Sequence, residues 1–406
     1  MRISFLCSSL EPGRDGVGDY TRRLAGEFIR QGHLCVAVAL NDAHINAVVS
    51  ETQQIQGISV SVLRLPDKMP WSLRKLETSK WLAKFNPDWF SLQFVPFGFH
   101  PKGLCFGLGK WLETLNPTAY WHIMFHELWL GLDKKCPVKH RVWGGLQRFI
   151  ILDMVRRLRP QMVHTQADLY RETLSHHKIA SAILPLFSNI PQSSGDGWSK
   201  LLEPLVTKAV RKPEARTNFY LAGVFGAVAP EWSAEKAVDS LLPLTQRFQK
   251  KLVLVFFGKN NLSAETFNKL INQLQDRAIV IVAGARNDFE ISIILQALDI
   301  GLATTPLQLI QKSGSVAAML EHGLSVLVTR DDWHLRGTKN PFENKCPRLL
   351  TPKQMATLQT LPIRESLKPA ANGVKQTADQ MLSSMKSSLR SSPLAKSGKV
   401  INSFGR

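Results

Sequence analysis

Short apolar runs alternate with longer amphipathic stretches along the first half of the chain. Between apolar runs at residues 3–7 and 34–40, residues 19–31 place Leu24 and Phe28 at helical spacing. Further apolar runs of strand length lie at residues 58–63, 89–93, 119–125 and 162–165. A strand–helix–strand order of this kind predicts a parallel sheet covered by helices.

The second half repeats this pattern after a break. Residues 191–214 are rich in Ser, Gly, Pro and Lys and have weak apolar periodicity, which indicates a domain boundary. Beyond the boundary, strands are predicted at residues 219–225, 252–257, 278–282, 300–304 and 325–329. Helices are predicted between them at residues 234–248, 264–275, 290–297 and 315–322.

A length of 406 residues fits two domains of about 200 residues better than one core. We therefore predict an α/β protein of two tandem Rossmann-like, doubly wound domains that face a cleft. The predicted parts are an N-terminal domain at residues 1–195, a linker at 196–215, a C-terminal domain at 216–375, and a C-terminal helix with a flexible basic tail at 376–406.

Composition and charge narrow the class of protein. With 44% hydrophobic and 20% charged residues, the chain has the composition of a globular protein rather than a disordered one. The 51 Lys and Arg exceed the 32 Asp and Glu by 19, which predicts an anionic partner. The cysteines lack any Cys-x-x-Cys spacing, so the sequence favours the reducing cytoplasm over a disulfide framework or zinc knuckle. No apolar run is long enough for a predicted spanning helix.

Three known ligand-binding motifs are incomplete or wrongly spaced in this sequence. The Gly16-Val17-Gly18 start of a dinucleotide fingerprint has Thr21 in its third glycine position, which disfavours an oxidoreductase. No complete P-loop occurs. His122 and His126 stand four apart on a predicted strand, so about 13 Å separates them and they are too far apart to share a metal ion.

A basic helical stretch at residues 141–159 permits two interpretations. Arg141, Arg148 and Arg159 share one side of a helical wheel, and apolar residues such as Ile150 and Met154 share another. The stretch is either a domain helix with a solvated charged side, or a basic amphipathic helix that lies on an anionic membrane. No aromatic residues interleave with the cations as a nucleic-acid surface would require, so we predict no nucleic-acid partner.

Four segments carry a family resemblance. The first is the strand followed by Gly16-Val17-Gly18-Asp19-Tyr20 and a helix ending in Gly-His, and the second is the strand that leads into MFHELW with His126. The third is GVFGAVAPEWSAEK with Lys236, and the fourth runs from ALDIGLATT through Lys312-Ser313-Gly314-Ser315 to HGLSVLV. Together they resemble glycosyltransferases of the GT-B fold, of the retaining family 4 type that includes many bacterial cell-surface sugar transferases. The resemblance covers residues 1 to about 370.

The resemblance implies transfer of a sugar from a nucleoside-diphosphate donor to a glycan or lipid-linked acceptor, with retention, without a metal and without a cofactor. It places the donor on the C-terminal domain and the acceptor on the N-terminal domain, in cell-surface polysaccharide synthesis, in the cytoplasm or peripherally on the inner membrane face. The implied catalytic residues are His126, Lys236 and Lys312, with Asp19 and Tyr20 on the acceptor. The implied donor-binding residues are Gly16, Gly18, Lys259, Arg286, Ser313, Gly314, Ser315 and Glu321.

The chain departs from the family pattern at three positions. Ala227 stands where the family carries an arginine, and Ile310 and Ala318 stand where it carries two glutamates. Lys312, two serine hydroxyls and the amides of a predicted helix start supply a phosphate-binding alternative in the same loop. These losses also support a second hypothesis, a catalytically degenerate GT-B homologue that acts as a membrane-associated binding or scaffold subunit.

Overall fold

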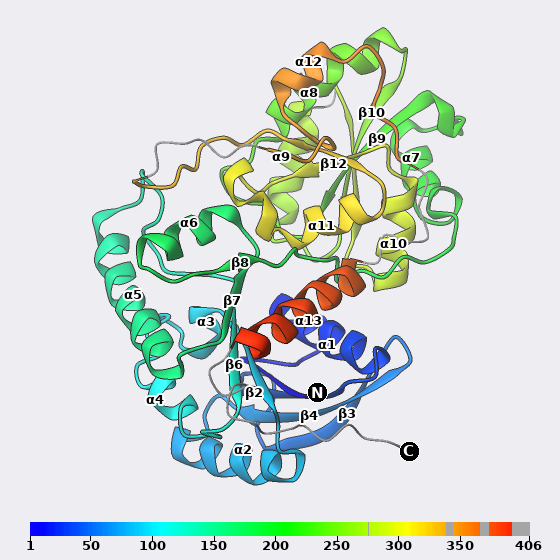
Figure 1. The fold of residues 1–406 in the computed structure, drawn as a ribbon. Helices are drawn as coiled ribbons and strands as arrows, with labels where there is room; N and C mark the ends of the chain where they lie inside the picture. Colours follow the sequence, from blue (N-terminus) through cyan, green and yellow to red (C-terminus); the bar gives the residue numbers. More distant parts are fainter. Residues whose placement is uncertain (275, 338–343, 366–372, 392–406) are drawn as a thin grey trace. The chain divides into compact units, whose positions relative to one another are not determined.

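The computed structural model of the 406-residue chain describes residues 1–274, 276–337, 344–365 and 373–391 (Figure 1). The chain divides into two compact units. Of the described residues, unit 1 contains 1–131, 136–185 and 374–391, and unit 2 contains 132–135 and those between 186 and 373. The chain therefore enters unit 2 early, through a short segment, and returns to unit 1 at its end.

Unit 1 is built on an eight-stranded sheet in the order β3-β4-β2-β1-β5-β6-β7-β8. Neighbouring strands are parallel except β3, which pairs antiparallel with β4. The strands are β1 (Arg2–Cys7), β2 (Leu34–Asp42), β3 (Val49–Ile55), β4 (Ile58–Pro66), β5 (Trp89–Phe94), β6 (Tyr120–Phe125), β7 (Met162–Thr165) and β8 (Ala182–Ile183).

Helices cover this sheet. They are α1 (Gly16–Arg30), α2 (Trp71–Phe85), α3 (Pro96–Phe99), α4 (Leu108–Leu112), α5 (Val138–Leu158), α6 (Asp168–His176) and α13 (Gly373–Ser391). The last helix, α13, lies beside α1 (Figure 1), where Gln31 Nε2 donates to Asp379 Oδ1 at 2.8 Å. Its buried residues Val374, Ala378, Met381, Leu382 and Met385 join the core of unit 1.

Unit 2 has a six-stranded, fully parallel sheet in the order β11-β10-β9-β12-β13-β14. Its strands are β9 (Phe219–Phe225), β10 (Lys251–Phe257), β11 (Ile279–Gly284), β12 (Ile300–Ala303), β13 (Ser325–Val328) and β14 (Leu349–Leu350). Its helices are η1 (Trp198–Leu202), α7 (Glu203–Val210), η2 (Arg216–Asn218), α8 (Ala234–Arg247), α9 (Ala264–Leu274), α10 (Asp288–Ala297), η3 (Leu307–Lys312), α11 (Gly314–Glu321) and α12 (Pro352–Thr357).

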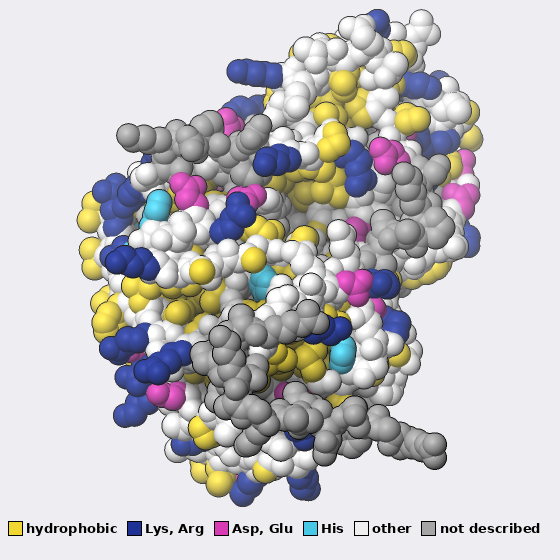
Figure 2. Space-filling model, in the orientation of Figure 1, with side chains coloured by type: hydrophobic (Ala, Val, Ile, Leu, Met, Phe, Trp, Pro, Cys, Tyr) yellow, Lys and Arg dark blue, Asp and Glu magenta, His cyan; other side chains and the backbone are white. Residues whose placement is uncertain are grey.

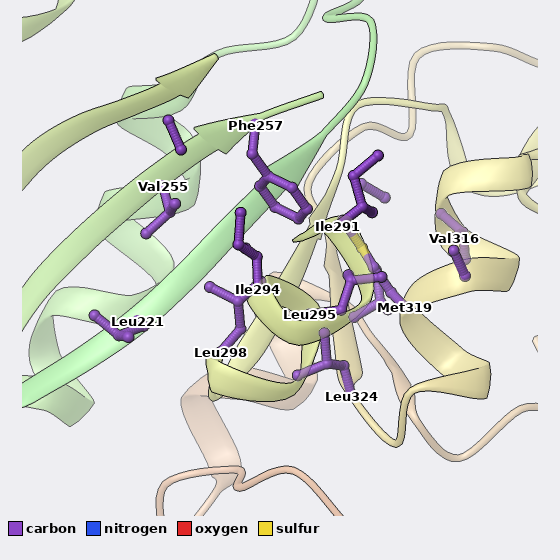
Figure 3. Packing of buried hydrophobic residues seen from close by; sticks show 14 of the residues in the cluster. Leu221, Val255, Phe257, Ile291, Ile294, Leu295, Leu298, Val316, Met319 and Leu324 are labelled. Atoms are coloured by element: carbon purple, nitrogen blue, oxygen red, sulfur yellow. The ribbon is translucent and has the colours of Figure 1, made fainter. Parts of the chain in front are cut away.

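Both faces of the unit 2 sheet are buried, because successive side chains of each strand enter opposite cores. Along β10, Val253, Val255 and Phe257 enter one core with residues of α10 and α11. Figure 3 shows Val255 and Phe257 in this core. Leu252, Leu254 and Phe256 enter the other core with residues of α8 and α9. The apolar runs without alternation in the sequence are thus strands covered on two sides.

Each predicted strand matches an observed one, but strands β3, β8 and β14 were not predicted. The antiparallel β3 was missed because its sequence VSETQQI is largely polar, and β8 and β14 have only two residues each. Most of the predicted linker at residues 196–215 is helical, because Leu202 and Val206 of η1 and α7 are buried in the unit 2 core. The C-terminal helix predicted within residues 376–406 is present as part of α13. The rest of that predicted segment, residues 392–406, lies outside the described residues.

Candidate functional site

The strand order of unit 2 defines where a ligand is expected. From β9 the chain proceeds to β10 and β11 on one side, and from β12 it proceeds to β13 and β14 on the other, while β9 and β12 are neighbours. Open α/β sheets bind ligands outside the carboxyl ends of their strands at such a switch point. The loops that follow β9 and β12 therefore form the candidate site of unit 2.

The loop after β9 is tied to neighbouring segments by hydrogen bonds to its backbone, and it ends at Ser233, the N-cap of α8. The Ala227 carbonyl accepts a hydrogen bond from Thr304 Oγ1 at 3.1 Å, which ties this loop to the end of β12. Ser233 caps α8 and accepts a hydrogen bond from the Lys236 N–H at 3.2 Å. Lys236 lies in the first turn of α8 with an exposed side chain, and no ion pair to another described residue involves it. A positive charge and the positive end of a helix dipole therefore coincide there.

The segment after β12 contains the predicted Lys312-Ser313-Gly314-Ser315 turn. Lys312 ends η3, and Ser313 caps α11 by accepting a hydrogen bond from the Val316 N–H at 3.4 Å. The Ser313 hydroxyl also lies 3.2 Å from Thr305 Oγ1 and 3.1 Å from Ser315 Oγ. Gly314 is exposed. The predicted helix start is confirmed, and its hydroxyls form a connected cluster at the carboxyl end of β12.

Arg330, which the sequence analysis missed, joins three loops at this edge. It follows β13, and its Nη1 donates to the Thr304 carbonyl at 3.2 Å. Its guanidinium pairs with Asp332 at 2.8 Å and with Glu231 of the β9–α8 loop at 3.3 Å. Hydrogen bonding to Arg330 lowers the pKa of Asp332. Only 10% of the Arg330 side chain is exposed, so the cation is held in place rather than extended into solvent.

Two further predicted cations lie on the flank of the site. Lys259 follows β10 and is exposed, and Arg286 follows β11. The Arg286 guanidinium donates to the Ala283 carbonyl at 2.8 Å and pairs with Glu290 at 3.1 Å. Since strands are about 4.8 Å apart, the end of β11 is roughly 10 Å from the end of β9. Arg286 thus shares the edge but not the switch point, and its charge is already balanced.

Glu321 lies at the opposite end of α11 from the Lys312 turn. Its carboxylate accepts a hydrogen bond from the Ser188 N–H at 2.8 Å, and its carbonyl accepts one from Gln192 Nε2 at 2.5 Å. The structure therefore does not bring Glu321 together with the other donor-binding candidates. Ile310 and Ala318, which occupy the positions of the family glutamates, are buried in the core of unit 2 with exposed fractions of 2% and 0%.

The glycine loop of unit 1 is satisfied by its own residues. Asp15 Oδ1 caps α1 by accepting hydrogen bonds from the N–H groups of Val17 at 2.7 Å and Gly18 at 3.0 Å. A Cβ on Gly18 would overlap the Ser9 carbonyl, so this position requires glycine for close packing, whereas Gly16 has open space around it. These two amides are therefore engaged by Asp15 in this structure.

The predicted acceptor residues have different surroundings. Asp19 Oδ1 accepts hydrogen bonds from the Gly13 N–H at 3.0 Å and from Arg22 at 2.7 Å, and 17% of its side chain is exposed. Tyr20 is buried, and burial raises the pKa of its hydroxyl. Its ring meets the His126 ring edge to face, with 4.9 Å between the centroids.

His126 is enclosed, with both ring nitrogens hydrogen-bonded. Nε2 lies 2.9 Å from Gln93 Oε1, and Nδ1 lies 2.8 Å from Gln166 Nε2. Burial lowers its pKa to about 3, although the Gln166 hydrogen bond acts in the opposite direction. A neutral imidazole at the end of β6 is therefore positioned by two amides, and Tyr20 covers its face.

A chain of buried polar groups continues from His126 across the sheet. Gln93 Nε2 lies 2.8 Å from Ser91 Oγ, which lies 2.8 Å from His122 Nδ1. His122 Nε2 in turn lies 3.0 Å from His164 Nδ1. Burial lowers the pKa of His122 well below its ordinary value and that of His164 to about 4. Gln93 Oε1 can only accept and Gln166 Nε2 can only donate, so these two amides fix the tautomer of His126 that carries its proton on Nε2.

An ion-pair network closes the carboxyl edge of unit 1 at β2 and β4. Arg64 Nε donates to Asp42 Oδ2 at 2.8 Å, and Arg64 also pairs with Glu11 of the β1–α1 loop. Asp42 accepts hydrogen bonds from the Ser9 hydroxyl at 3.1 Å and the Leu10 N–H at 3.2 Å. Burial raises the pKa of Asp42, but the hydrogen bonds from Arg64, His44 and Leu10 outweigh it and lower the pKa overall.

No group of three or more His, Cys, Asp or Glu side chains in the described part is arranged to hold a metal ion. Within the same part of the chain, no helix combines the length and the apolar character needed to span a bilayer.

Comparison with known proteins identifies the fold. No protein-family model and no curated protein sequence matches the chain. HepE from Anabaena in complex with UDP is similar over 98% of this chain and 100% of its own, with a TM-score of 0.52 and 15% identity. A putative UDP-N-acetylglucosamine 2-epimerase from Listeria monocytogenes is similar over 96% and 97%, with a TM-score of 0.51 and 12% identity.

A glycosyltransferase from Rickettsia africae is similar over 96% of this chain and 99% of its own, with a TM-score of 0.50 and 13% identity. At such identities a likeness shows the fold alone. The chain consists of two Rossmann-like units of the GT-B fold class, which confirms the predicted fold.

Proposed function

We propose that the protein is a glycosyltransferase whose unit 2 holds a nucleoside-diphosphate sugar. The observation that carries this proposal is the position of Lys236, an exposed cation in the first turn of α8 at the switch point of the sheet. A diphosphate there would meet a positive charge and the amides of a helix start. HepE, which shares the fold, has been solved with UDP, and this supports the same class of ligand.

Departure of the nucleoside diphosphate places negative charge on its phosphate oxygens, and fixed cations stabilise this charge in the transition state. In the proposal, Lys236 and the Lys312 turn contact the diphosphate, and Arg330 holds the two loops in register. The reaction needs no metal or cofactor and retains the anomeric configuration. The acceptor is a glycan or lipid-linked sugar in cell-surface polysaccharide synthesis, and Asp19 and Tyr20 contribute to its site.

Thermal unfolding with UDP, GDP and ADP tests donor binding. A nucleotide that binds the folded state raises the melting temperature by ligand linkage. We expect one of the three to do so, and we expect Lys236→Ala to remove most of the shift. Lys269→Ala is the matched control, because Lys269 is an exposed lysine of α9 that pairs with Glu265 at 2.8 Å. Equal loss in both variants, or no shift with any nucleotide, would contradict the proposal.

Transfer itself requires a second measurement. Radiolabelled UDP- and GDP-sugars are incubated with the protein and a lipid extract, and labelled product is separated from donor. We expect label in the lipid or glycan fraction with wild type and a reduced rate with Lys312→Ala. A donor that binds without label transfer to any fraction would contradict the enzymatic part of the proposal and leave donor binding intact.

A second candidate function is a binding or scaffold subunit that has lost catalysis. Ile310 and Ala318 favour it, because both positions of the family glutamates are apolar and buried here. The enclosure of His126 by Gln93 and Gln166 also favours it. Such a subunit needs no donor, so it predicts unchanged melting temperatures with all three nucleotides.

A further inference from the structure

Helix α5 is apolar on two separate faces. One face is buried against unit 1 and includes Ile150, Ile151, Met154 and Leu158. The other face carries large apolar side chains that are exposed to 42–69%, and we call it the α5 stripe: Val138, Val142, Leu146 and Phe149. The sequence analysis identified only the buried face, and the large side chains of the second face are exposed.

The α5 stripe is flanked by cations on both sides. At about 100° per residue, its four side chains fall within an arc of roughly 80°, with Lys139 on one side and Arg141 and Arg148 on the other. No ion pair involves these three cations in the described part of the chain, and the single acid of the helix, Asp153, pairs with Arg156 and Arg157. Figure 2 shows yellow and dark blue side chains together along the left edge, where Figure 1 places α5.

Packing fixes the rotation of α5, so the stripe cannot turn into the core. A Cβ on Gly144 would overlap the Leu130 carbonyl, and Gln147 Oε1 accepts a hydrogen bond from the Leu130 N–H at 2.9 Å. Trp143 Nε1 and Gln147 Nε2 donate to the Lys102 carbonyl at 2.8 and 3.1 Å. The helix therefore presents its apolar stripe outward in the folded protein.

We propose that the α5 stripe docks on an anionic lipid surface, with Val142 and Phe149 in the acyl boundary and the flanking cations on lipid headgroups. An apolar row between cations matches the requirements of an interfacial helix. A second copy of this chain fits less well, because a two-fold contact through the stripe would bring Arg141, Arg148 and Lys139 against the same cations of the partner. The proposal is independent of sugar transfer and extends beyond it.

Vesicle flotation tests the proposal. We expect the full-length protein to float with phosphatidylglycerol–phosphatidylcholine vesicles, to remain behind with phosphatidylcholine alone, and to dissociate at high salt. Val142→Glu with Phe149→Glu should lower the bound fraction by about tenfold or more, since burying either carboxylate in the acyl boundary is unfavourable. Arg141→Gln with Arg148→Gln should lower it to a smaller extent and reduce the salt dependence.

Phe289→Glu is the matched control, because Phe289 is 47% exposed on α10 of unit 2 and should leave flotation unchanged. Circular dichroism melts check that each variant is folded, and the milder Val142→Ser with Phe149→Ser replaces any variant that is not. Equal flotation of wild type and folded stripe variants would overturn the proposal. A wild-type dimer that the stripe variants convert to monomer, without vesicle binding, would overturn it in favour of a second copy.

Discussion

The two units differ in how the polar groups at the carboxyl ends of their sheet strands are used, although both sheets have the Rossmann-like architecture. In unit 1, charged and polar groups at this edge bind one another: Asp42 is paired with Arg64, Asp15 caps α1, and both nitrogens of His126 are engaged. In unit 2, Lys236 is exposed at the switch point without a described ion pair. We therefore expect substitutions at the edge of unit 1 to change the free energy of unfolding. Substitutions at the edge of unit 2 should instead change the affinity for a nucleotide.

The largest expected effect is on the stability of unit 1. Arg64→Ala leaves the fully buried carboxylate of Asp42 without its cation, and we expect the free energy of unfolding to fall by about 3–5 kcal/mol. Urea unfolding measures it. Arg156→Ala is the control, because 75% of that side chain is exposed and its pair with Asp153 contributes less than about 1 kcal/mol. A similar decrease in the free energy of unfolding in the two variants would show that the buried ion pair of Arg64 and Asp42 does not stabilise unit 1 more than an exposed pair does.

Acid should destabilise unit 1 through its buried histidines. An unfolded histidine has a pKa near 6.5, while burial lowers the pKa of His164 to about 4 and that of His126 to about 3. The unfolded state therefore binds more protons below pH 6.5. The free energy of unfolding should be at its full value above that pH and should decline by a few kcal/mol as the pH falls from about 6.5 to 4.

Urea unfolding at several pH values measures this decline. His164→Asn should make the slope shallower between pH 6.5 and 4, because one group with a lowered pKa is removed. His176→Asn, which replaces an exposed histidine of α6, is the control and should leave the slope unchanged. An unchanged slope in His164→Asn would show that this histidine does not carry the pH dependence.

At the edge of unit 2, Arg330→Gln should affect ligand binding more than folding. The substitution leaves Glu231 and Asp332 without their cation, and their negative charges then oppose a diphosphate. We expect the affinity for the stabilising nucleotide to fall by about tenfold. Isothermal titration calorimetry measures it, with Arg247→Gln at the far end of α8 as control. Equal nucleotide affinities in the two variants would show that Arg330 does not contribute to nucleotide binding.

The smallest expected effects come from removing two helix caps, one at the edge of each unit. Ser313→Ala and Asp15→Ala each remove an N-cap acceptor, from α11 and α1 respectively, and should lower the free energy of unfolding by about 1 kcal/mol. With nucleotide present, the Ser313 variant should show a larger deficit than the Asp15 variant, because only Ser313 lies at the proposed donor site. Equal deficits would contradict the assignment of the donor to unit 2.

The sequence predicted the strands well because each unit buries both faces of its sheet. Short apolar runs such as LVLVFF and FLC, which recur between amphipathic stretches, are typical of buried strands. Elements that depend on tertiary contacts were missed. Strand β3 is polar along most of its length and exists through pairing with β4, and α7 is stable because Val206 packs into the core of unit 2.

The candidate site was predicted in part. Lys236 and the Lys312 turn follow adjacent strands at the switch point, since local patterns locate strand ends and helix starts. The partners of these residues depend on distant segments. In the sequence, Arg330 looks like a residue of a charged surface loop. Its ion pair with Glu231, 99 positions earlier in the chain, is visible only in the structure. The family resemblance places Glu321 at the donor site, but its carboxylate accepts a hydrogen bond from Ser188, 133 residues earlier in the chain.

The return of α13 to unit 1 sets the order in which the protein can mature on the ribosome. Strands β1 to β8 are synthesised first, yet Ala378, Met381 and Met385 fill their core only after all of unit 2 has been translated. The apolar residues of unit 1 that α13 covers therefore stay exposed while unit 2 is translated. During this time we expect them to be a binding surface for chaperones. Synthesis of α13, rather than completion of β8, is therefore the step that completes the core of unit 1.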